Sequence, residues 1–230
     1  MQIEEKNSTI HMMNRNTIII TIVSIIAIFG FLSIAYVLTN TPQQKKVYSE
    51  LKEIKKTDHV KWSKDKKNIL VEYSDLQCPA CKAYHEYFKS NIDNDKVITN
   101  NVTFVYRHFP LAQHQHSEEA AYAAEAAGKQ GKFFEMSDLM FTNQPKWENE
   151  GNVKEIFEGY AKDLKLDLEK FRTDRDSKEV KDKVNQDLIS GQQFNVDATP
   201  TFYLNGIKIT DVASLDGFKR LLIKPGNITQ

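Results

Sequence analysis

An uninterrupted apolar stretch near the start of the chain limits what that part can fold into. Residues 18–38 read IIITIVSIIAIFGFLSIAYVL, which is 21 residues without a charged side chain. As a helix rising about 1.5 Å per residue, this stretch crosses the roughly 30 Å hydrocarbon core of a bilayer. A buried core helix would normally show a polar stripe, and a cleaved signal peptide has a shorter apolar region. We therefore predict a permanent transmembrane anchor over residues 18–38.

The charges that flank the anchor do not decide its orientation. Lys6 and Arg15 precede it and Lys45 and Lys46 follow it, so the positive-inside rule favours neither side. The simplest topology leaves a short cytoplasmic tail, residues 1–17, and exports the rest. We predict a single-pass protein of the cell membrane with an extracytoplasmic domain.

The remainder of the chain has the composition of one folded domain. Lys and Arg number 31 and Asp and Glu number 31, so the formal net charge is zero, which argues against nucleic-acid binding. Residues 39–57 are polar and rich in lysine, and we predict a linker that is partly helical. Residues 58–230 are predicted to form the domain.

Hydrophobic periodicity predicts a mixed α/β order for this domain. The apolar run at 68–76 is typical of a buried strand, and a helix between it and the strand at 102–109 completes a βαβ unit. Residues 114–193 are helical in character, their charge runs are expected to be solvated faces, and Gly128 is expected to be a helix C-cap. Further predicted elements are a strand at 58–63, a hairpin at 201–210 and a final helix that begins at Ser214.

The chain has two cysteines, Cys78 and Cys81, separated by Pro79 and Ala80. If a helix begins here, Cys78 occupies the N-cap and Pro79 the first helical position, where proline loses no hydrogen bond. The sulfur of Cys78 then faces backbone N–H groups and the positive end of the helix dipole, and both favour a thiolate. Thiolates in such motifs have pKa values lowered from about 8.5 to roughly 3.5–7.5. We predict a redox pair in which Cys78 is the nucleophile and the better shielded Cys81 resolves mixed disulfides.

A metal site is the main alternative for a C-x-x-C motif. A structural zinc ion needs four ligands, and the chain has no second cysteine pair. His108, His114 and His116 could complete a site on paper, but His114 and His116 are two residues apart and point to different faces of a helix. We therefore expect no metal, and we interpret His108 and His114 as packing or capping residues.

Four segments, taken in order, resemble the DsbA-like branch of the thioredoxin superfamily, and more narrowly its membrane-tethered bacterial disulfide-formation proteins. The segments are EYSDLQCPAC, VYRHFPL, SEEAAYAAEAAGKQGKFFEM and ATPTFYLNG. The resemblance covers about residues 58–223. It implies an α/β thioredoxin fold with a helical insertion at about 114–193, preceded here by one N-terminal transmembrane helix.

Three further positions carry over from this resemblance. Glu72 matches the buried acid beneath the active site, whose implied role is to accept or relay the proton of Cys81. A strand glutamate facing solvent is the alternative. Thr199 and Pro200 match the cis-proline loop, which would bring the backbone of Thr199 beside Cys78 and pair with an extended substrate peptide.

Ala80 departs from the family pattern that has histidine inside the motif. That histidine adds thiolate stabilisation, so with Pro79 and Ala80 as its tuning residues this chain is expected to be a weaker oxidant than the most oxidising members. His85, seven residues past Cys78, is interpreted as an exposed helix residue.

The resemblance implies an extracytoplasmic thiol-disulfide oxidoreductase that introduces disulfides into exported proteins. Its expected partners are unfolded exported proteins with cysteine thiols and a membrane quinone-linked protein that reoxidises the pair. We expect it to act as a monomer without a cofactor. The alternatives are a membrane-tethered reductase or isomerase, a non-catalytic client-binding module, and a metal-delivery protein.

Overall fold

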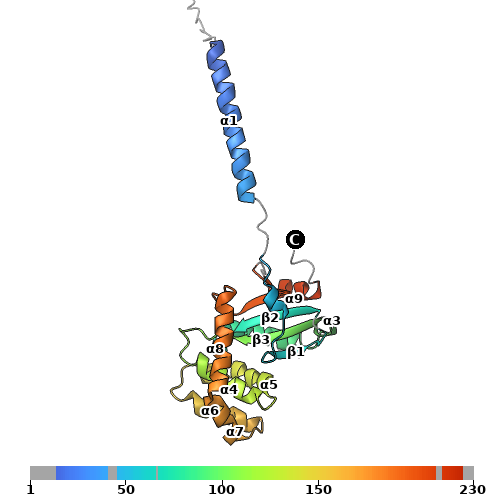
Figure 1. Ribbon diagram of the computed structural model, residues 1–230, viewed down its shortest axis with the longest axis vertical. Coiled ribbons are helices and arrows are strands. Elements are labelled where there is room, and N and C mark those ends of the chain that lie inside the picture. Colours follow the sequence, from blue (N-terminus) through green and yellow to red (C-terminus); the bar gives the residue numbers. More distant parts are fainter. Residues whose placement is uncertain (1–13, 41–45, 66, 211–213, 225–230) are drawn as a thin grey trace, which may run out of the picture. The chain divides into compact units, whose positions relative to one another are not determined.

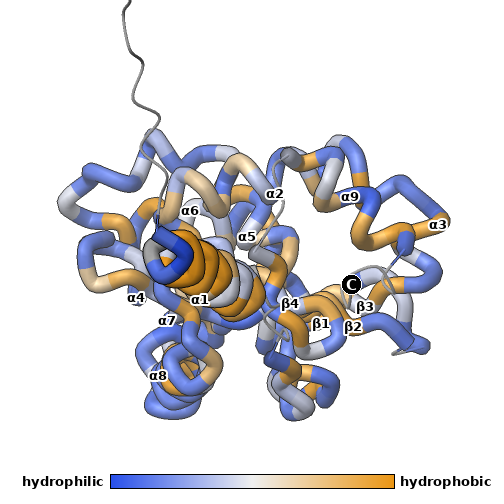
Figure 2. The backbone as a smooth tube through the Cα atoms, turned by 90° about the horizontal axis from the view of Figure 1, so that it is seen from above, coloured by the Kyte–Doolittle hydropathy of each residue, from blue (hydrophilic) through white to orange (hydrophobic). Residues whose placement is uncertain are grey.

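The computed structural model describes residues 14–40, 46–65, 67–210 and 214–224. They fall into two compact units, Met1–Gln44 and Lys45–Gln230. In the first unit, Arg15–Asn40 form helix α1, whose tube is mostly hydrophobic in Figure 2. Over Ile18–Thr39 this helix is long and apolar enough to cross a membrane, as the sequence predicts.

A five-stranded mixed sheet forms the centre of the second unit, in the order β1-β3-β2-β4-β5. Figure 1 labels β1, β2 and β3. The central strand β2 is parallel to β3 and antiparallel to β4, while the outer pairs are antiparallel. The strands are β1 (His59–Trp62), β2 (Asn68–Ser74), β3 (Val102–His108), β4 (Thr201–Leu204) and β5 (Ile207–Lys208).

The helices confirm the predicted α/β order. Helix α2 connects β2 to β3, and a helical insertion lies between β3 and β4 (Figure 1). The helices of the domain are α2 (Pro79–Asn91), α3 (Lys96–Thr99), α4 (Ser117–Gly128), α5 (Phe133–Thr142), α6 (Val153–Asp163), α7 (Leu168–Asp176), α8 (Lys178–Gln193) and α9 (Leu215–Ile223), with 3-10 turns η1 (Ser49–Lys52) and η2 (Gln144–Lys146).

Residues of β2 alternate between two hydrophobic cores. Leu70 joins a core that includes Phe88 of α2 and Phe218 of α9. Its neighbour Val71 joins a second core that includes Leu51 of η1. Because successive side chains of a strand point to opposite faces, Glu72 points toward the same side as Leu70, the side that α2 covers.

Part of the predicted linker at 39–57 belongs to the folded domain instead. Val47 forms an isolated antiparallel bridge with Ile207, and the Tyr48 N–H donates to the Gly206 carbonyl at 2.8 Å. Leu51 is fully buried. Tyr48 and Leu51, which lie between lysines in the sequence, pack in the second core, although Val47 is 50% exposed.

The prediction of Gly128 as a C-cap is wrong by one residue. Gly128 is the last residue of α4, Lys129 is the C-cap, and the left-handed conformation lies at Gly131, with φ +75°. A Cβ at Gly128 would lie 2.7 Å from the His59 ring. The glycine therefore provides room for a side chain of β1, which local sequence cannot indicate.

Candidate active site

Cys78 and Cys81 lie where the end of β2 turns into α2. Cys78 is the N-cap, with φ −76° and ψ 124°, and Pro79 begins the helix. Both cysteines are free and buried, Cys78 6% exposed and Cys81 fully shielded. The local geometry is therefore the one that the C-x-x-C spacing predicts.

The two sulfurs have opposite acidities. A hydrogen bond from the Cys81 thiol is the largest cause that lowers the pKa of Cys78, to about 5, against the effect of burial. Burial raises the pKa of Cys81 well above its ordinary value, and its hydrogen bond to Cys78 adds to this. The pair thus combines a sulfur that favours the thiolate, at Cys78, with one that favours the thiol, at Cys81.

The backbone N–H groups at the start of α2 are not the largest cause of the lowered pKa of Cys78, although the C-x-x-C motif suggests that they would be. Among the described residues, its side chain makes no regular capping hydrogen bond. The backbone N–H groups of Cys81 and Ala80 lower its pKa, but less than the Cys81 thiol and the Thr199 side chain do. The partner sulfur, rather than the helix end, is the main influence.

The loop before β4 lies against the Cys78 sulfur. The Thr199–Pro200 peptide bond is cis, in agreement with the conformation that the resemblance implies. The Cys78 thiol donates to the Thr199 carbonyl oxygen over 3.3 Å. The structure thus brings together Cys78, Thr199 and Pro200 from distant parts of the chain.

Glu72 lies in the centre of β2, paired with Tyr106 on one side and Phe202 on the other. It is 6% exposed, so it does not face solvent. Burial raises its pKa to about 7, and hydrogen bonding to Ser74 and the charge of Lys61 oppose that rise. A carboxyl group with this pKa can both give and take a proton near neutral pH.

Glu72 also contacts a small internal cavity of about 20 Å³. Tyr106, His85 and Ser137 contribute to its wall. A space of this size is large enough for one water molecule. Glu72 therefore has room for a hydrogen-bond partner on the side of the sheet that α2 covers.

The interpretation of His85 as an exposed residue is wrong. Its ring stacks on Phe141 of α5 at 4.7 Å, and its Nε2 lies 3.0 Å from the Asp138 carboxylate. Histidine at this helical position gives no sign of burial because the covering helix comes from the insertion, more than fifty residues later.

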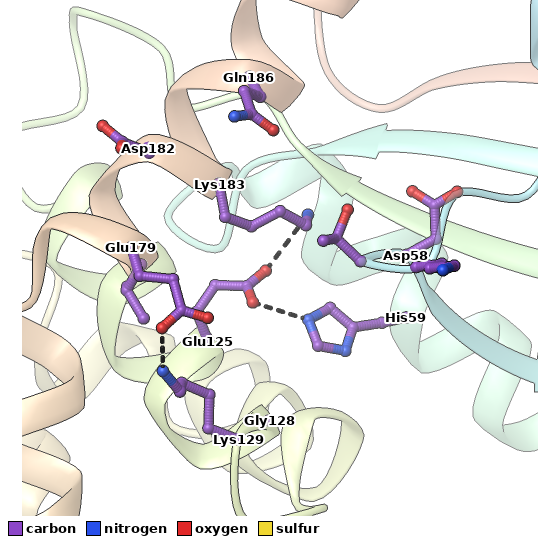
Figure 3. A pocket seen from close by; sticks show the side chains of 12 residues that line it. Asp58, His59, Glu125, Gly128, Lys129, Glu179, Asp182, Lys183 and Gln186 are labelled. Carbon is purple, nitrogen blue, oxygen red and sulfur yellow. Dashed lines mark hydrogen bonds and ion pairs between the residues drawn. The ribbon is translucent and has the colours of Figure 1, made fainter.

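A second buried polar cluster lies beside a pocket of about 500 Å³ between β1, α4 and α8 (Figure 3). The Glu125 carboxylate lies 2.9 Å from His59 Nε2 and 3.1 Å from His108 Nε2. Lys183 approaches the same carboxylate at 3.4 Å and pairs with Asp187 at 2.5 Å. These charges are buried, so the expectation that the insertion's charge runs are wholly solvated is wrong.

The cluster consists of matched charges rather than metal ligands. Within the described ranges, no group of three or more His, Cys, Asp or Glu side chains is arranged to hold a metal ion. His108 is a packing residue in this cluster, and His114 contacts a buried carboxylate near the cysteines. Neither histidine approaches the cysteine pair as a zinc ligand.

The domain that contains the cysteine pair matches a known family. A family model described as Thioredoxin matches residues 54–224. The chain belongs to the thioredoxin family. Its sheet, the helix after the cysteine pair and the helical insertion are the thioredoxin-like fold that the sequence predicts.

Solved structures of the thioredoxin family share this fold. BdbD from Bacillus subtilis matches with a TM-score of 0.63 and 25% identity, over 81% of this chain and 98% of that one. Wolbachia pipientis alpha-DsbA1 matches with a TM-score of 0.67 and 21% identity, over 78% and 96%. These matches show that the second unit has the same fold as the two solved structures.

Curated relatives match through only part of their length. The Na(+)/H(+) antiporter NhaA 1 of Salinispora arenicola is 34% identical over 150 residues, 65% of this chain and 22% of that protein. The Na(+)/H(+) antiporter NhaA of Herminiimonas arsenicoxydans is 36% identical over 153 residues, 66% of this chain and 23% of that protein. This chain thus spans less than a quarter of the length of these relatives.

Proposed function

We propose that this chain is an extracytoplasmic thiol-disulfide oxidase that introduces disulfides into exported proteins through Cys78 and Cys81. The observation that carries the proposal is the acidity of Cys78, whose pKa is lowered to about 5 beside a protected Cys81 thiol. A stabilised thiolate favours the reduced protein, so the disulfide form readily passes its oxidising equivalents on.

The reaction would proceed by two thiol-disulfide exchanges. A substrate thiolate attacks Cys78 in the oxidised protein, the Cys78–Cys81 bond breaks, and its electron pair goes to Cys81. A second substrate thiolate then attacks the substrate sulfur of the mixed disulfide and releases Cys78. The proposed role of Glu72 is to give a proton to Cys81 as it leaves, and to take it back when the pair is reoxidised.

The proposed substrate-binding residues are Thr199 and Pro200. The Thr199 carbonyl lies beside the Cys78 sulfur, where it can meet the backbone of an extended peptide. Such a contact is made to the peptide backbone and not to side chains. It therefore suits substrates that have cysteines in common but otherwise differ in sequence. Pro79 and Ala80 are the proposed tuning residues.

The proposed setting follows from the apolar helix. Residues 18–38 would anchor the protein in the cell membrane, with residues 1–17 as a cytoplasmic tail and the redox domain outside. The domain would act as a monomer on unfolded proteins with cysteine thiols. A membrane quinone-linked partner would reoxidise it.

The deciding experiment measures the reduction potential of the pair and the oxidation of a reduced, unfolded protein. We expect a potential less negative than the value of about −270 mV for thioredoxin, and substrate oxidation that Cys78→Ser abolishes. A potential near that of thioredoxin would support the reductase alternative. Substrate folding that survives Cys78→Ser would support the client-binding module. Cys81→Ser serves as the matched control: without the Cys78–Cys81 disulfide it should not oxidise the reduced protein either, but its Cys78 thiolate should attack a substrate that already has a disulfide and remain in the mixed disulfide.

A further inference from the structure

The backbone of Asp75 contacts both cysteines. Its carbonyl oxygen accepts a hydrogen bond from the Cys78 N–H at 3.0 Å. Its own N–H donates to the Cys81 sulfur at 3.5 Å. Asp75 directly follows β2 and begins the turn that leads into α2, so one peptide group of this turn points at the buried sulfur.

The side chain of Asp75 is fixed by three hydrogen bonds. Its carboxylate is completely buried. Oδ1 accepts from the Gln77 N–H at 2.8 Å, and Oδ2 accepts from the Leu111 N–H at 2.9 Å and from His114 Nδ1 at 2.7 Å. The tautomer of His114 that has its proton on Nδ1 donates to this oxygen.

These bonds join two loops that are distant in the chain. Gln77 belongs to the cysteine turn, whereas Leu111 and His114 belong to the loop between β3 and α4. With its side chain held from both loops, the Asp75 residue cannot rotate without breaking buried hydrogen bonds, which is costly. Its N–H therefore stays directed at Cys81.

We propose that Asp75 is a positioning residue whose anchored N–H stabilises the anion that forms on Cys81 when the Cys78–Cys81 disulfide opens. The inference rests on the proposed function. As the new bond forms between the substrate sulfur and Cys78, the electron pair of the old bond arrives at Cys81. This anion forms in a buried place where charge is costly unless a donor meets it. The Asp75 N–H supplies that donor until Glu72 delivers a proton.

The consequence is a specific effect on one step. A leaving thiolate that is better stabilised leaves faster, so loss of the Asp75 anchor should slow disulfide opening. The pKa of Cys78 in the reduced protein should change by less than the opening rate does, because Asp75 is not among the main groups that set it and influences it through the Cys81 thiol. If Asp75 contributed only to the stability of the fold, its loss would not slow disulfide opening more than it changes the acidity of Cys78.

The test uses single turnover of the oxidised full-length protein with a synthetic peptide that has one cysteine. The rate of mixed-disulfide formation is measured for Asp75→Asn and for the milder His114→Gln, which leaves both backbone donors to Asp75 in place. Asp95→Asn is the matched control, because Asp95 also accepts from two backbone N–H groups, those of Val97 and Ile98, away from the cysteines. The Cys78 titration is followed in each reduced variant by thiolate absorbance.

We expect Asp75→Asn to slow opening about tenfold and His114→Gln about threefold, which is the range for the net contribution of one ordinary hydrogen bond. Asp95→Asn should open at the wild-type rate with an unchanged Cys78 titration, and in Asp75→Asn and His114→Gln that titration should shift by less than the opening rate does. Wild-type rates in both Asp75→Asn and His114→Gln would overturn the inference, and so would a Cys78 titration shifted as far as the rate. If the wild-type protein forms neither a mixed disulfide nor, by attack of a second peptide thiolate, a disulfide between two peptides, the proposed function fails and the inference falls with it.

Discussion

The Cys78 sulfur lies 3.3 Å from the Thr199 carbonyl oxygen, although the two residues are 121 positions apart in the chain. The helical insertion and α8 occupy most of that separation. The antiparallel pairing of β2 with β4 brings the two residues together, because Cys78 lies in the turn after β2 and Thr199 in the loop before β4. A peptide that approaches the sulfur must therefore also meet the backbone of the loop before β4.

Replacement of Ala80 by histidine should make the protein a stronger oxidant. Ala80 is exposed, so a larger side chain fits, and a histidine there adds positive charge close to the Cys78 thiolate. Each unit by which the pKa of Cys78 falls should raise the reduction potential by about 30 mV while the thiolate dominates. Equilibration with glutathione measures the potential. Ala83→His, on an exposed position one turn later in α2, should change it much less, and equal shifts would contradict this explanation.

Glu72→Gln should stabilise the reduced protein at alkaline pH. The pKa of Glu72 is raised to about 7 by burial, above its ordinary 4.5. A raised pKa gives stability that is present below pH 4.5 and is lost as pH rises through 7. The loss approaches about 3 kcal/mol, from 1.36 kcal/mol per pKa unit over that interval.

Denaturant unfolding at pH 4.5 and pH 8.5 checks this prediction. The free energy of unfolding of Glu72→Gln should exceed that of the wild-type protein only at pH 8.5. Glu86→Gln, an exposed acid on α2, is the control and should leave the difference unchanged. A gain by Glu72→Gln of equal size at both pH values would mean that Glu72 is not protonated in the folded protein at pH 4.5.

Acid should destabilise the domain through the Glu125 cluster. Burial opposes the charge of Glu125, but hydrogen bonds with His108 and His59 outweigh it and hold the pKa of Glu125 well below its usual range. Burial also lowers the pKa of His108 below 6.5. Both groups have depressed pKa values in the folded state, so both give stability that is present at neutral pH and is lost as pH falls, first below 6.5 and then below 4.5.

Glu125→Gln should cost about 3–5 kcal/mol at pH 7, the range for leaving buried charges without their partner. Its stability should also depend less on pH between 6.5 and 3 than that of the wild-type protein. Glu179→Gln is the control, because Glu179 lines the same pocket but its side chain is 77% exposed. An unchanged acid profile in Glu125→Gln would show that other groups dominate acid unfolding.

Gly206→Ala should lower stability by about 1–3 kcal/mol. Gly206 has φ +79°, and an added Cβ would collide with the Tyr48 carbonyl oxygen. Gly159→Ala is the opposite case, because the added Cβ in α6 would meet nothing within 4 Å beyond the neighbouring backbone of its own helix. The stability of the folded protein is expected to rise by about 1 kcal/mol in this variant. Thermal unfolding of both variants measures the difference, and a neutral Gly206→Ala would show that Tyr48 is not held against this turn.

The sequence predicts the features that depend on neighbouring residues, such as where helices and strands begin. The position of Cys78 at a helix start follows from Pro79, and the order of strands and helices along the chain follows from the spacing of apolar residues. The proximity of Thr199 to Cys78 came only from the family resemblance, because no local pattern reports a contact between distant loops. The burial of His85 and Glu125 could not be predicted, since both look like ordinary surface residues of a helix until the insertion and β1 cover them.

The bridge between Val47 and Ile207 has a protective consequence. The outermost strand of any sheet presents unpaired peptide groups that can recruit a foreign extended chain and start aggregation. Unfolded polypeptides, the proposed clients, are the molecules best able to exploit such a row. By lying along β5, the stretch at 47–48 occupies part of that row with its own backbone. Unfolded substrate chains are therefore less able to bind to this edge of the sheet, and the cysteine pair remains the place where they bind.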